Sequence, residues 1–340
     1  MTPRASAPAP QLGEHDPGVE AARERAEQVQ SGTIARLRLG DADVRFGTAG
    51  WTDPTLMAPG VFYPNGAMSA EARLKFYATR FPLVEVDSTY YALPVPRMSE
   101  LWIDRTPDEF VFDVKAFAWM TGHATETERL PRALRDALPK EIADTARLYP
   151  KEVPREIRDE AWRLFADAVR PLHEAGKLGA IFLQYPPWVR PAEHSAAMLA
   201  RTRERLGALP LAVEFRHGDW LSQKHRDRTL GLLRDYDMSY VVVDEPQGLA
   251  SSVPPDVAVT SPRLAVVRLH GRRGDMWEKR GATVQQRFRY LYDQGELKRW
   301  VPKIVEIAGE AEQVHVVFNN CYGNYGTTNA LEMSSLVAAR

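Results

Sequence analysis

Residues 211–220 read Leu-Ala-Val-Glu-Phe-Arg-His-Gly-Asp-Trp, an apolar strand that ends in a cluster of charge. Because side chains alternate between the two faces of a strand, Glu214 and Arg216 share one face. Burying a charge is tolerable only when the charge has a partner or a ligand. The segment therefore indicates either a structural ion pair or the floor of a binding site, within a fold built from buried strands.

Seven similar runs, short and rich in β-branched and aromatic residues, occur elsewhere in the chain. The eight predicted strands are Val44–Thr48, Leu83–Thr89, Phe110–Ala116, Gly179–Tyr185, Leu211–Arg216, Ser239–Asp244, Leu264–His270 and Val314–Asn319. The predicted helices include Ala70–Arg80, Arg158–Ala175, Ala196–Leu206, Asp227–Tyr236, Val284–Gln294 and Leu297–Ile307. Strands that alternate with helices build parallel sheets through right-handed crossovers, so this pattern predicts one closed (β/α)8 barrel of the TIM type. A doubly wound open sheet is the alternative, although no Gly-x-Gly-x-x-Gly turn follows the first strand.

Three parts of the chain lie outside this alternation. Residues 1–42 are rich in Ala and Pro and then in charged residues, so we expect a partly disordered or helical N-terminal extension before a barrel of residues 43–340. Residues 124–159 follow the third strand and are charged and punctuated by Pro, which predicts a partly helical insertion, either a lid or a peripheral excursion. The segment Gln247–Pro262, rich in Ser and Pro, predicts an ordered loop across one barrel face.

The composition limits the class of protein. In 340 residues, 44% of them hydrophobic, no apolar run approaches the roughly 20 residues of a membrane-spanning helix, so we expect a cytoplasmic protein with no membrane partner. Lys and Arg number 44 against 45 Asp and Glu, which disfavours a nucleic acid as partner but leaves local basic patches open. The single cysteine, Cys321, excludes an internal disulfide and zinc sites that need two Cys ligands. The oligomeric state stays open.

Nearly every predicted strand changes from apolar to polar at its C-terminal end. In a TIM barrel these ends meet at one mouth, where active sites lie. The polar and aromatic residues there include Trp51, Glu85, Asp87, Tyr90, Tyr91, Lys115, His123, Gln184, Trp188, Glu214, Arg216, Asp244, Arg268, His270, Asn319 and Asn320. Buried polar groups add little net stability and are costly when unpaired, so we expect a binding site at this mouth.

The chain also resembles a known family. The segments that carry the resemblance are Gly47-Thr-Ala-Gly-Trp51, Phe62-Tyr-Pro64, Phe81–Pro94, Phe110–Lys115, Phe182-Leu-Gln-Tyr-Pro-Pro187, Val213-Glu-Phe-Arg216, Arg268-Leu-His-Gly271 and Phe318-Asn-Asn320. They occur in one order between about Val44 and Leu336, and they are similar to the DUF72 family, also called YecE-like proteins. The resemblance implies a TIM barrel but no activity, because the family is named for its unknown function. Asp87 stands where such proteins more often have Asn.

Cations and flat aromatic rings predict the kind of ligand. Guanidinium groups bind phosphate or carboxylate in bidentate fashion, so the cations Lys115, Arg216, Arg268 and Arg272 predict an anionic small molecule. The aromatic candidates for stacking on a sugar or a base are Trp51, Tyr90, Tyr91, Trp188, Trp220 and Trp277, with simple packing as the alternative. The remaining predicted ligand-binding residues are Gln184, Asn319 and Asn320.

Acid–base chemistry at this mouth has five candidates, Glu85, His123, Glu214, Asp244 and His270. We predict Glu214 as the base and His270 as the acid. The structural alternatives are that Glu214 only neutralises Arg216 or Arg268, and that His270 only satisfies a hydrogen bond to a neighbouring strand.

Metal catalysis is a weaker hypothesis. The candidate ligands are Glu85, Asp87, His123, Glu214, Asp244 and His270, but no His-x-His or His-Glu-x-x-His spacing occurs and the cations of the mouth oppose a metal ion. We therefore predict no metal or cofactor and favour an enzyme that acts by acid–base chemistry on a phosphorylated or carboxylated, sugar-like molecule. The alternatives are a metal-dependent phosphoesterase or nuclease-like hydrolase, and a non-catalytic anion-binding protein.

Overall fold

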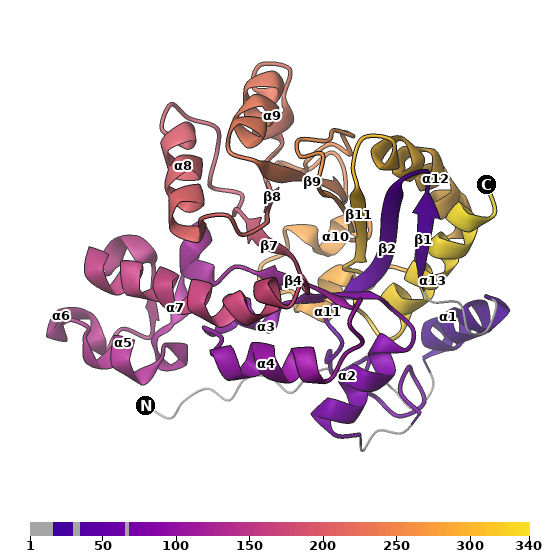
Figure 1. Ribbon diagram of the computed structural model, residues 1–340, viewed down its shortest axis with the longest axis horizontal. Coiled ribbons are helices and arrows are strands. Elements are labelled where there is room, and N and C mark those ends of the chain that lie inside the picture. Colours follow the sequence, from indigo (N-terminus) through magenta and orange to yellow (C-terminus); the bar gives the residue numbers. More distant parts are fainter. Residues whose placement is uncertain (1–15, 30–34, 65–67) are drawn as a thin grey trace.

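A closed barrel of eight parallel strands forms the core of the computed structural model, which describes residues 16–29, 35–64 and 68–340 (Figure 1). The strands are β2 (Ala42–Ala49), β3 (Leu83–Val86), β4 (Val111–Lys115), β7 (Leu178–Gln184), β8 (Leu211–Glu214), β9 (Met238–Asp244), β10 (Ala265–Leu269) and β11 (Gln313–Phe318). They lie in chain order around the barrel, and β2 closes it by pairing with both β11 and β3. The predicted (β/α)8 fold is confirmed.

The strands are almost continuously apolar because both of their faces are covered. β9 and β10, with the sequences Met-Ser-Tyr-Val-Val-Val-Asp and Ala-Val-Val-Arg-Leu, are buried at every position. Parallel strands between a layer of helices and a barrel interior have this composition. The few charged residues of these strands therefore occupy special positions in the barrel.

Helices cover the outside of the barrel. The longer ones are α2 (Ala70–Ala78), α4 (Pro96–Asp104), α7 (Arg155–Glu174), α8 (Ser195–Leu206), α9 (Arg226–Asp235), α12 (Gln294–Ala308) and α13 (Tyr325–Ala338). Along α7, buried residues fall every four positions from Ile157 to Val169, as expected for a helix with one face on a core. No helix within the described part of the chain is long and apolar enough to cross a membrane.

Several element bounds near the mouth differ from the prediction. The strand predicted for Leu211–Arg216 ends at Glu214, so Arg216 lies just after β8 rather than within it. The strand predicted for Leu83–Thr89 ends at Val86, because the next residues turn into the short helix α3 (Ser88–Tyr91). The helix predicted for Val284–Gln294 is only α11 (Val284–Phe288). The chain leaves the helical conformation there, and α12 starts at Gln294, where a capping box between Asp293 and Glu296 satisfies its first N–H groups.

Residues 124–159 form a small two-stranded sheet with short helices around it. These elements are β5 (Thr125–Glu126), η2 (Thr127–Arg129), α5 (Arg132–Asp136), α6 (Lys140–Ala143), β6 (Arg147–Leu148) and η3 (Pro150–Glu152). Trp119, in η1 (Ala118–Thr121), ties this segment to the barrel by donating from its indole to the Leu148 carbonyl at 2.9 Å. From Arg155 onward the predicted insertion is already α7.

The other loops at the C-terminal ends of the strands carry η4 (Gly218–Leu221) and α10 (Gly274–Trp277). Between β9 and β10 the structure has no helix and no strand. Thr260 anchors this loop, because its hydroxyl donates to the Met238 carbonyl and accepts from the Tyr240 N–H, both at 2.7 Å.

The N-terminal extension contributes a helix and a strand. α1 (Pro17–Gln28) lies beside α13 (Figure 1), where Arg25 pairs with Glu332 at 2.7 Å. β1 (Arg36–Leu39) pairs antiparallel with the first half of β2, up to Arg45, whereas β3 pairs with β2 only from Gly47 onward. Residues 1–15 and 30–34 of the predicted extension lie outside the described residues.

We expect Gly179→Ala to lower the free energy of unfolding by about 1–3 kcal/mol through overpacking. A Cβ at Gly179 would lie 2.4 Å from Asp113 Oδ1 and 2.6 Å from His315 Cε1. Asp113 and His315 are fully buried and lie 3.1 Å apart in a hydrogen bond, so neither can move aside easily. Gly231→Ala, inside α9 with open space around it, is the matched control and should raise stability by up to about 1 kcal/mol. Urea denaturation measures both; equal effects would contradict a rigid barrel interior.

Candidate functional site

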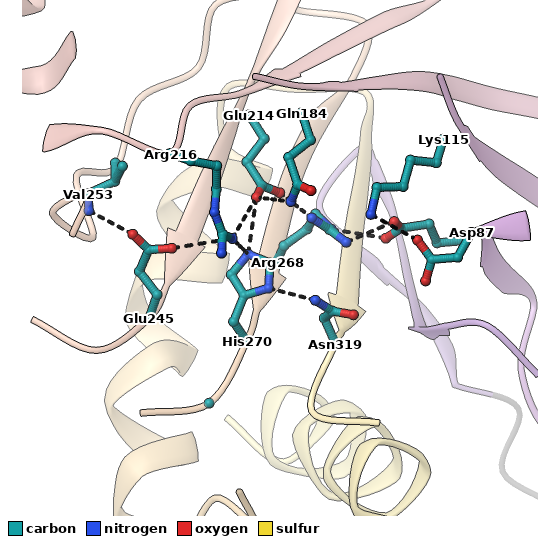
Figure 2. A network of polar contacts seen from close by, with 12 residues as sticks. Asp87, Lys115, Gln184, Glu214, Arg216, Glu245, Val253, Arg268, His270 and Asn319 are labelled. Atoms are coloured by element: carbon teal, nitrogen blue, oxygen red, sulfur yellow. Dashed lines mark hydrogen bonds and ion pairs between the residues drawn. The ribbon is translucent and has the colours of Figure 1, made fainter. Parts of the chain in front are cut away.

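A network of ion pairs and hydrogen bonds joins side chains from several strands of the barrel (Figure 2). Arg268 of β10 donates to both carboxylate oxygens of Glu85 on β3, at 2.9 and 2.8 Å. Its third nitrogen, Nη1, donates to Glu214 of β8. All three side chains are at most 1% exposed. One guanidinium group thus joins three strands of the barrel.

Glu214 is the most heavily hydrogen-bonded carboxylate of this network. Besides Arg268, it accepts from the Gln184 amide at 2.6 Å and from Arg216 Nη1 at 3.0 Å. Burial alone would raise the pKa of Glu214, but the surrounding cations, Arg268 foremost, hold it well below its usual range. At neutral pH this carboxylate is therefore an ionised anchor for Gln184 and Arg216.

A second pair of charges lies next to Glu85. Lys115 of β4 contacts Asp87 at 3.1 Å, and their side chains are 16% and 31% exposed. Burial raises the pKa of Glu85 to about 8, against the opposing effect of Arg268. Burial would also raise the pKa of Asp87, but Lys115, Arg268 and a hydrogen bond from Glu85 lower it. The environments of these two neighbouring carboxyl groups push their pKa values apart.

Arg216 lies at the mouth with its guanidinium carbon 4.5 Å from the centre of the Trp277 ring. Its polar contacts with the described residues all use one nitrogen, Nη1, which lies 3.0 Å from Glu214, 3.3 Å from His270 Nε2 and 3.4 Å from Glu245 (Figure 2). Within the described ranges no residue bonds to Nε or Nη2 of Arg216. The side chain is 16% exposed, so the other edge of the guanidinium fork is available to a ligand.

His270 is completely buried beside Glu214. Its Nδ1 lies 2.9 Å from Asn319 Nδ2, and its Nε2 lies 3.4 Å from Glu214 Oε1. Burial lowers the pKa of His270 to about 3, so the ring is uncharged at neutral pH. The acid and base roles predicted for His270 and Glu214 stay predictions, but these pKa directions favour the structural alternative for both residues.

Sequence reasoning missed two residues of the mouth. Glu245 is buried: one oxygen accepts from the Val253 N–H at 2.7 Å, whereas the other has no hydrogen-bond partner and faces Arg216. Burial raises the pKa of Glu245 to about 7. Arg287, on α11, has a buried Nε without a hydrogen-bond partner, and burial together with Arg216 lowers its pKa. Glu245 directly follows the predicted strand end at Asp244, a position that could have identified it.

Asp244 and Arg272 lie outside this network. Arg272 donates to both oxygens of Asp244, at 3.0 and 2.9 Å, and also contacts Glu296 at 3.1 Å. The Trp300 indole donates to Asp244 at 2.9 Å as well. These bonds tie the end of β9 to α12 and engage both oxygens of Asp244, whose predicted acid–base role stays a prediction.

The predicted aromatic residues divide into two groups. Tyr90, His123 and Trp188 form a row at the rim, with ring centres 5.3 and 5.4 Å apart, and Lys115 lies 5.1 Å from the Tyr90 ring. Tyr91 and Trp188 are 45% and 59% exposed, as expected of surfaces that could stack on a ligand.

Two of the predicted tryptophans instead pack into the core. Trp51 lies edge-on to Trp102, and Trp220 stacks on Phe215 at 4.2 Å. Asn320, also predicted at the mouth, is fully buried and donates to the carbonyl of Tyr290 and to Asn329. The structure thus places Trp51, Trp220 and Asn320 in packing or hydrogen-bonding positions away from the ion-pair network.

The candidate metal ligands are dispersed. No group of three or more His, Cys, Asp or Glu side chains within residues 16–29, 35–64 and 68–340 is arranged to hold a metal ion. Glu85, Asp87, Glu214 and Asp244 each contact a Lys or Arg side chain instead. The donor set as it stands fits cationic partners better than a metal ion.

Comparisons with known proteins agree with this fold. A family model described as "Protein of unknown function DUF72" matches residues 45–340. UPF0759 protein YunF of Bacillus subtilis (strain 168) is 29% identical over 86% of this chain and 94% of its own length. The crystal structure of a DUF72 family protein of Enterococcus faecalis V583 superposes with a TM-score of 0.69, at 25% identity over 87% of this chain and 95% of that one. One from Thermotoga maritima MSB8 gives 0.67, at 28% identity over 87% and 99%.

Replacing Arg268 with Met should lower the free energy of unfolding by about 3–5 kcal/mol, because it leaves the ionised Glu214 buried without its foremost cation and Glu85 without its hydrogen-bond donor. If the uncompensated charge is the cause, Arg268→Met combined with Glu85→Gln and Glu214→Gln should regain at least half of the loss. Chemical denaturation measures all variants. A triple variant no more stable than Arg268→Met would contradict the electrostatic explanation.

Glu245 should make the protein less stable as pH rises. Its folded-state pKa of about 7 exceeds its ordinary value of 4.5, so its contribution is fully present below about pH 4.5 and is lost as pH rises through 7. The change is on the order of 3 kcal/mol for the single proton. Glu245→Gln should flatten the dependence of unfolding free energy on pH between 5 and 8, whereas Asp275→Asn, at an exposed position, should leave it unchanged. An equal slope in the two variants would count against this assignment.

Proposed function

The chain belongs to the DUF72 family, a family of unknown function, and on that premise we propose a function from the geometry of its own barrel mouth. The protein is an enzyme that uses acid–base chemistry on an anionic small molecule. The ligand is phosphorylated or carboxylated and sugar-like, and it binds at the C-terminal ends of the barrel strands.

The unpaired edge of Arg216 is the observation that carries this proposal. The guanidinium group is fixed by Trp277 beneath it and by the contacts of Nη1, so its orientation does not depend on a ligand. Nε and Nη2 remain, and two adjacent N–H donors match the two oxygens of a phosphate or carboxylate. A preoriented donor pair loses little side-chain entropy on binding, which favours affinity.

The charge balance of the mouth supports an anion. Lys115, Arg216, Arg268 and Arg287 face four carboxyl groups, those of Glu85, Asp87, Glu214 and Glu245. Two of the four, Glu85 and Glu245, have pKa values raised by burial to about 8 and about 7. At pH values at which Glu85 and Glu245 hold protons, the cations of the mouth outnumber its ionised carboxylates, and the mouth attracts an anion.

The Glu85–Asp87 pair supplies the proton chemistry in this proposal. Two adjacent carboxyl groups with separated pKa values are the arrangement in which one holds a proton while the other stays ionised. Asp87 is 31% exposed and can touch a ligand, and Glu85 lies next to it with a pKa of about 8. Groups that titrate near neutral pH transfer protons most efficiently.

A non-catalytic anion-binding protein is the second candidate. The observation that favours it is the complete burial of Glu85, Glu214, Arg268 and His270, each at most 1% exposed. Groups sealed from solvent in this way can orient Arg216 without touching a ligand. Turnover distinguishes the two candidates, because both bind the anion.

Anion binding should depend on Arg216. In a thermal-shift screen of phosphorylated and carboxylated sugars, we expect at least one compound to raise the melting temperature of the wild type. Arg216→Gln should weaken its binding at least tenfold, because it removes the charge and the fork. Arg273→Gln, whose side chain pairs with Asp275 on a nearby loop, is the control and should change the affinity less than twofold. Equal affinity in Arg216→Gln would contradict an anion site on this fork.

Proton transfer should depend on Glu85. With the ligand from that screen as substrate, Glu85→Gln should reduce kcat at least a hundredfold while the affinity changes less than threefold. The same variant should remove the inflection near pH 8 from the pH profile of any residual turnover, since this pKa belongs to Glu85. If the ligand binds and the wild type turns nothing over, the non-catalytic candidate stands.

A further inference from the structure

A cavity of about 240 Å³ is lined by residues of α7 and α8, whose ribbons are shown in Figure 1, and by residues of η1 and of η3 in the insertion. We call it the α7–α8 pocket and define it by its charged residues and tryptophans, Trp119, Lys151, Arg158, Trp162, Arg201 and Arg205. None of the mouth residues described above lines this pocket.

The charge of the α7–α8 pocket is uncompensated. Other arginines of α7 are paired: Arg163 with Glu160 and Asp167, and Arg170 with Asp167. By contrast, Lys151, Arg158 and Arg201 contact no carboxylate in the part of the chain that the structure describes.

Arg158 is the most telling of these cations. Its Nε is sealed from solvent and has no hydrogen-bond partner. No described residue bonds to its other two nitrogens, Nη1 and Nη2, either, so the half-buried guanidinium group has no protein partner, which favours a bound anion. The cation is half-buried on the wall of the pocket, where it can present its other nitrogens to an anion.

The pocket also has an aromatic wall, formed by Trp162. Trp162 is buried to 8% exposure, and the guanidinium of Arg205 lies 5.2 Å from its ring centre. Asp159 holds Arg205 in this position through an ion pair. The guanidinium of Arg205 thus covers the indole, and its side chain is 33% exposed and lines the pocket, so a flat ring can stack on its other face. The pocket therefore combines anion-binding side chains with a stacking surface.

We infer that the α7–α8 pocket binds a small phosphorylated molecule that carries a flat ring, of mononucleotide size. Arg158, Lys151 and Arg201 bind the phosphate, and the ring stacks on the open face of the Arg205 guanidinium, whose other face lies on Trp162. The volume is below the roughly 300–1,000 Å³ of sites for larger ligands, which limits the ligand to about one ring system and one phosphate group. This site is independent of the function proposed for the mouth, and it gives the insertion a role as one of its walls.

Isothermal titration of the full-length chain with AMP, GMP, CMP and UMP tests the inference. We expect at least one nucleotide to bind, and its nucleoside and inorganic phosphate to bind at least tenfold more weakly, because each retains only half of the contacts. Arg158→Gln should weaken nucleotide binding at least tenfold. Arg170→Gln, the same change on the same helix outside the pocket, should alter it less than twofold.

The location has its own control. Arg216→Gln, which removes the anion fork of the mouth, should leave nucleotide binding within twofold of the wild type, and loss of binding in that variant would place the nucleotide at the mouth and overturn the inference. Absence of binding for all four nucleotides at millimolar concentration would overturn it too. Inorganic phosphate that binds as tightly as the nucleotide would overturn the inference that the ring contributes to binding.

Discussion

The pairing of Arg268 with Glu85 and Glu214 is the constraint on which the centre of this barrel depends. Interiors of such barrels are usually packed with branched apolar side chains. Here one layer consists of a cation between two carboxylates, drawn from β10, β3 and β8. Arg268 is the essential member, because its removal would leave two buried carboxyl groups without the cation that they share. It also links three strands, β3, β8 and β10, no two of which pair with each other in the barrel.

The mouth is built on this layer. Glu214 accepts hydrogen bonds from Arg268, Gln184 and Arg216. The position of Arg216 therefore depends on a carboxylate that the buried Arg268 holds in place. Glu245 contacts Arg216 from the loop after β9, and burial raises the pKa of its carboxyl group to about 7. Arg216, the proposed anion-binding residue, is thus oriented by a buried carboxylate, which is how a rigid scaffold preorganises a site.

The architecture and much of the mouth could be predicted from the sequence, because strand composition and the spacing of Glu214 and Arg216 are local properties. The pairing of Arg268 with Glu85 could not be predicted, because Glu85 lies 183 residues away in the chain and contacts Arg268 only when the barrel closes. Trp51 and Trp220 were expected at the mouth from their position after strands, yet side-chain packing on Trp102 and Phe215 decides where they point. The position of Glu245 directly after Asp244 made it a candidate for the mouth, but a sequence does not show whether a carboxylate after a strand end turns inward.

β1 has a consequence for the closure of the barrel. β3 accompanies β2 only from Gly47, so the first four residues of β2 would otherwise present free N–H and C=O groups. Open strand edges are templates for pairing with other chains, and β1 occupies this one through the register Arg36↔Arg45 to Leu39↔Ala42. The N-terminal extension thus covers an open edge of β2 that could otherwise pair with a strand of another molecule. Shortening the chain at its N-terminus past Arg36 would change the solubility of this protein rather than the chemistry of its mouth.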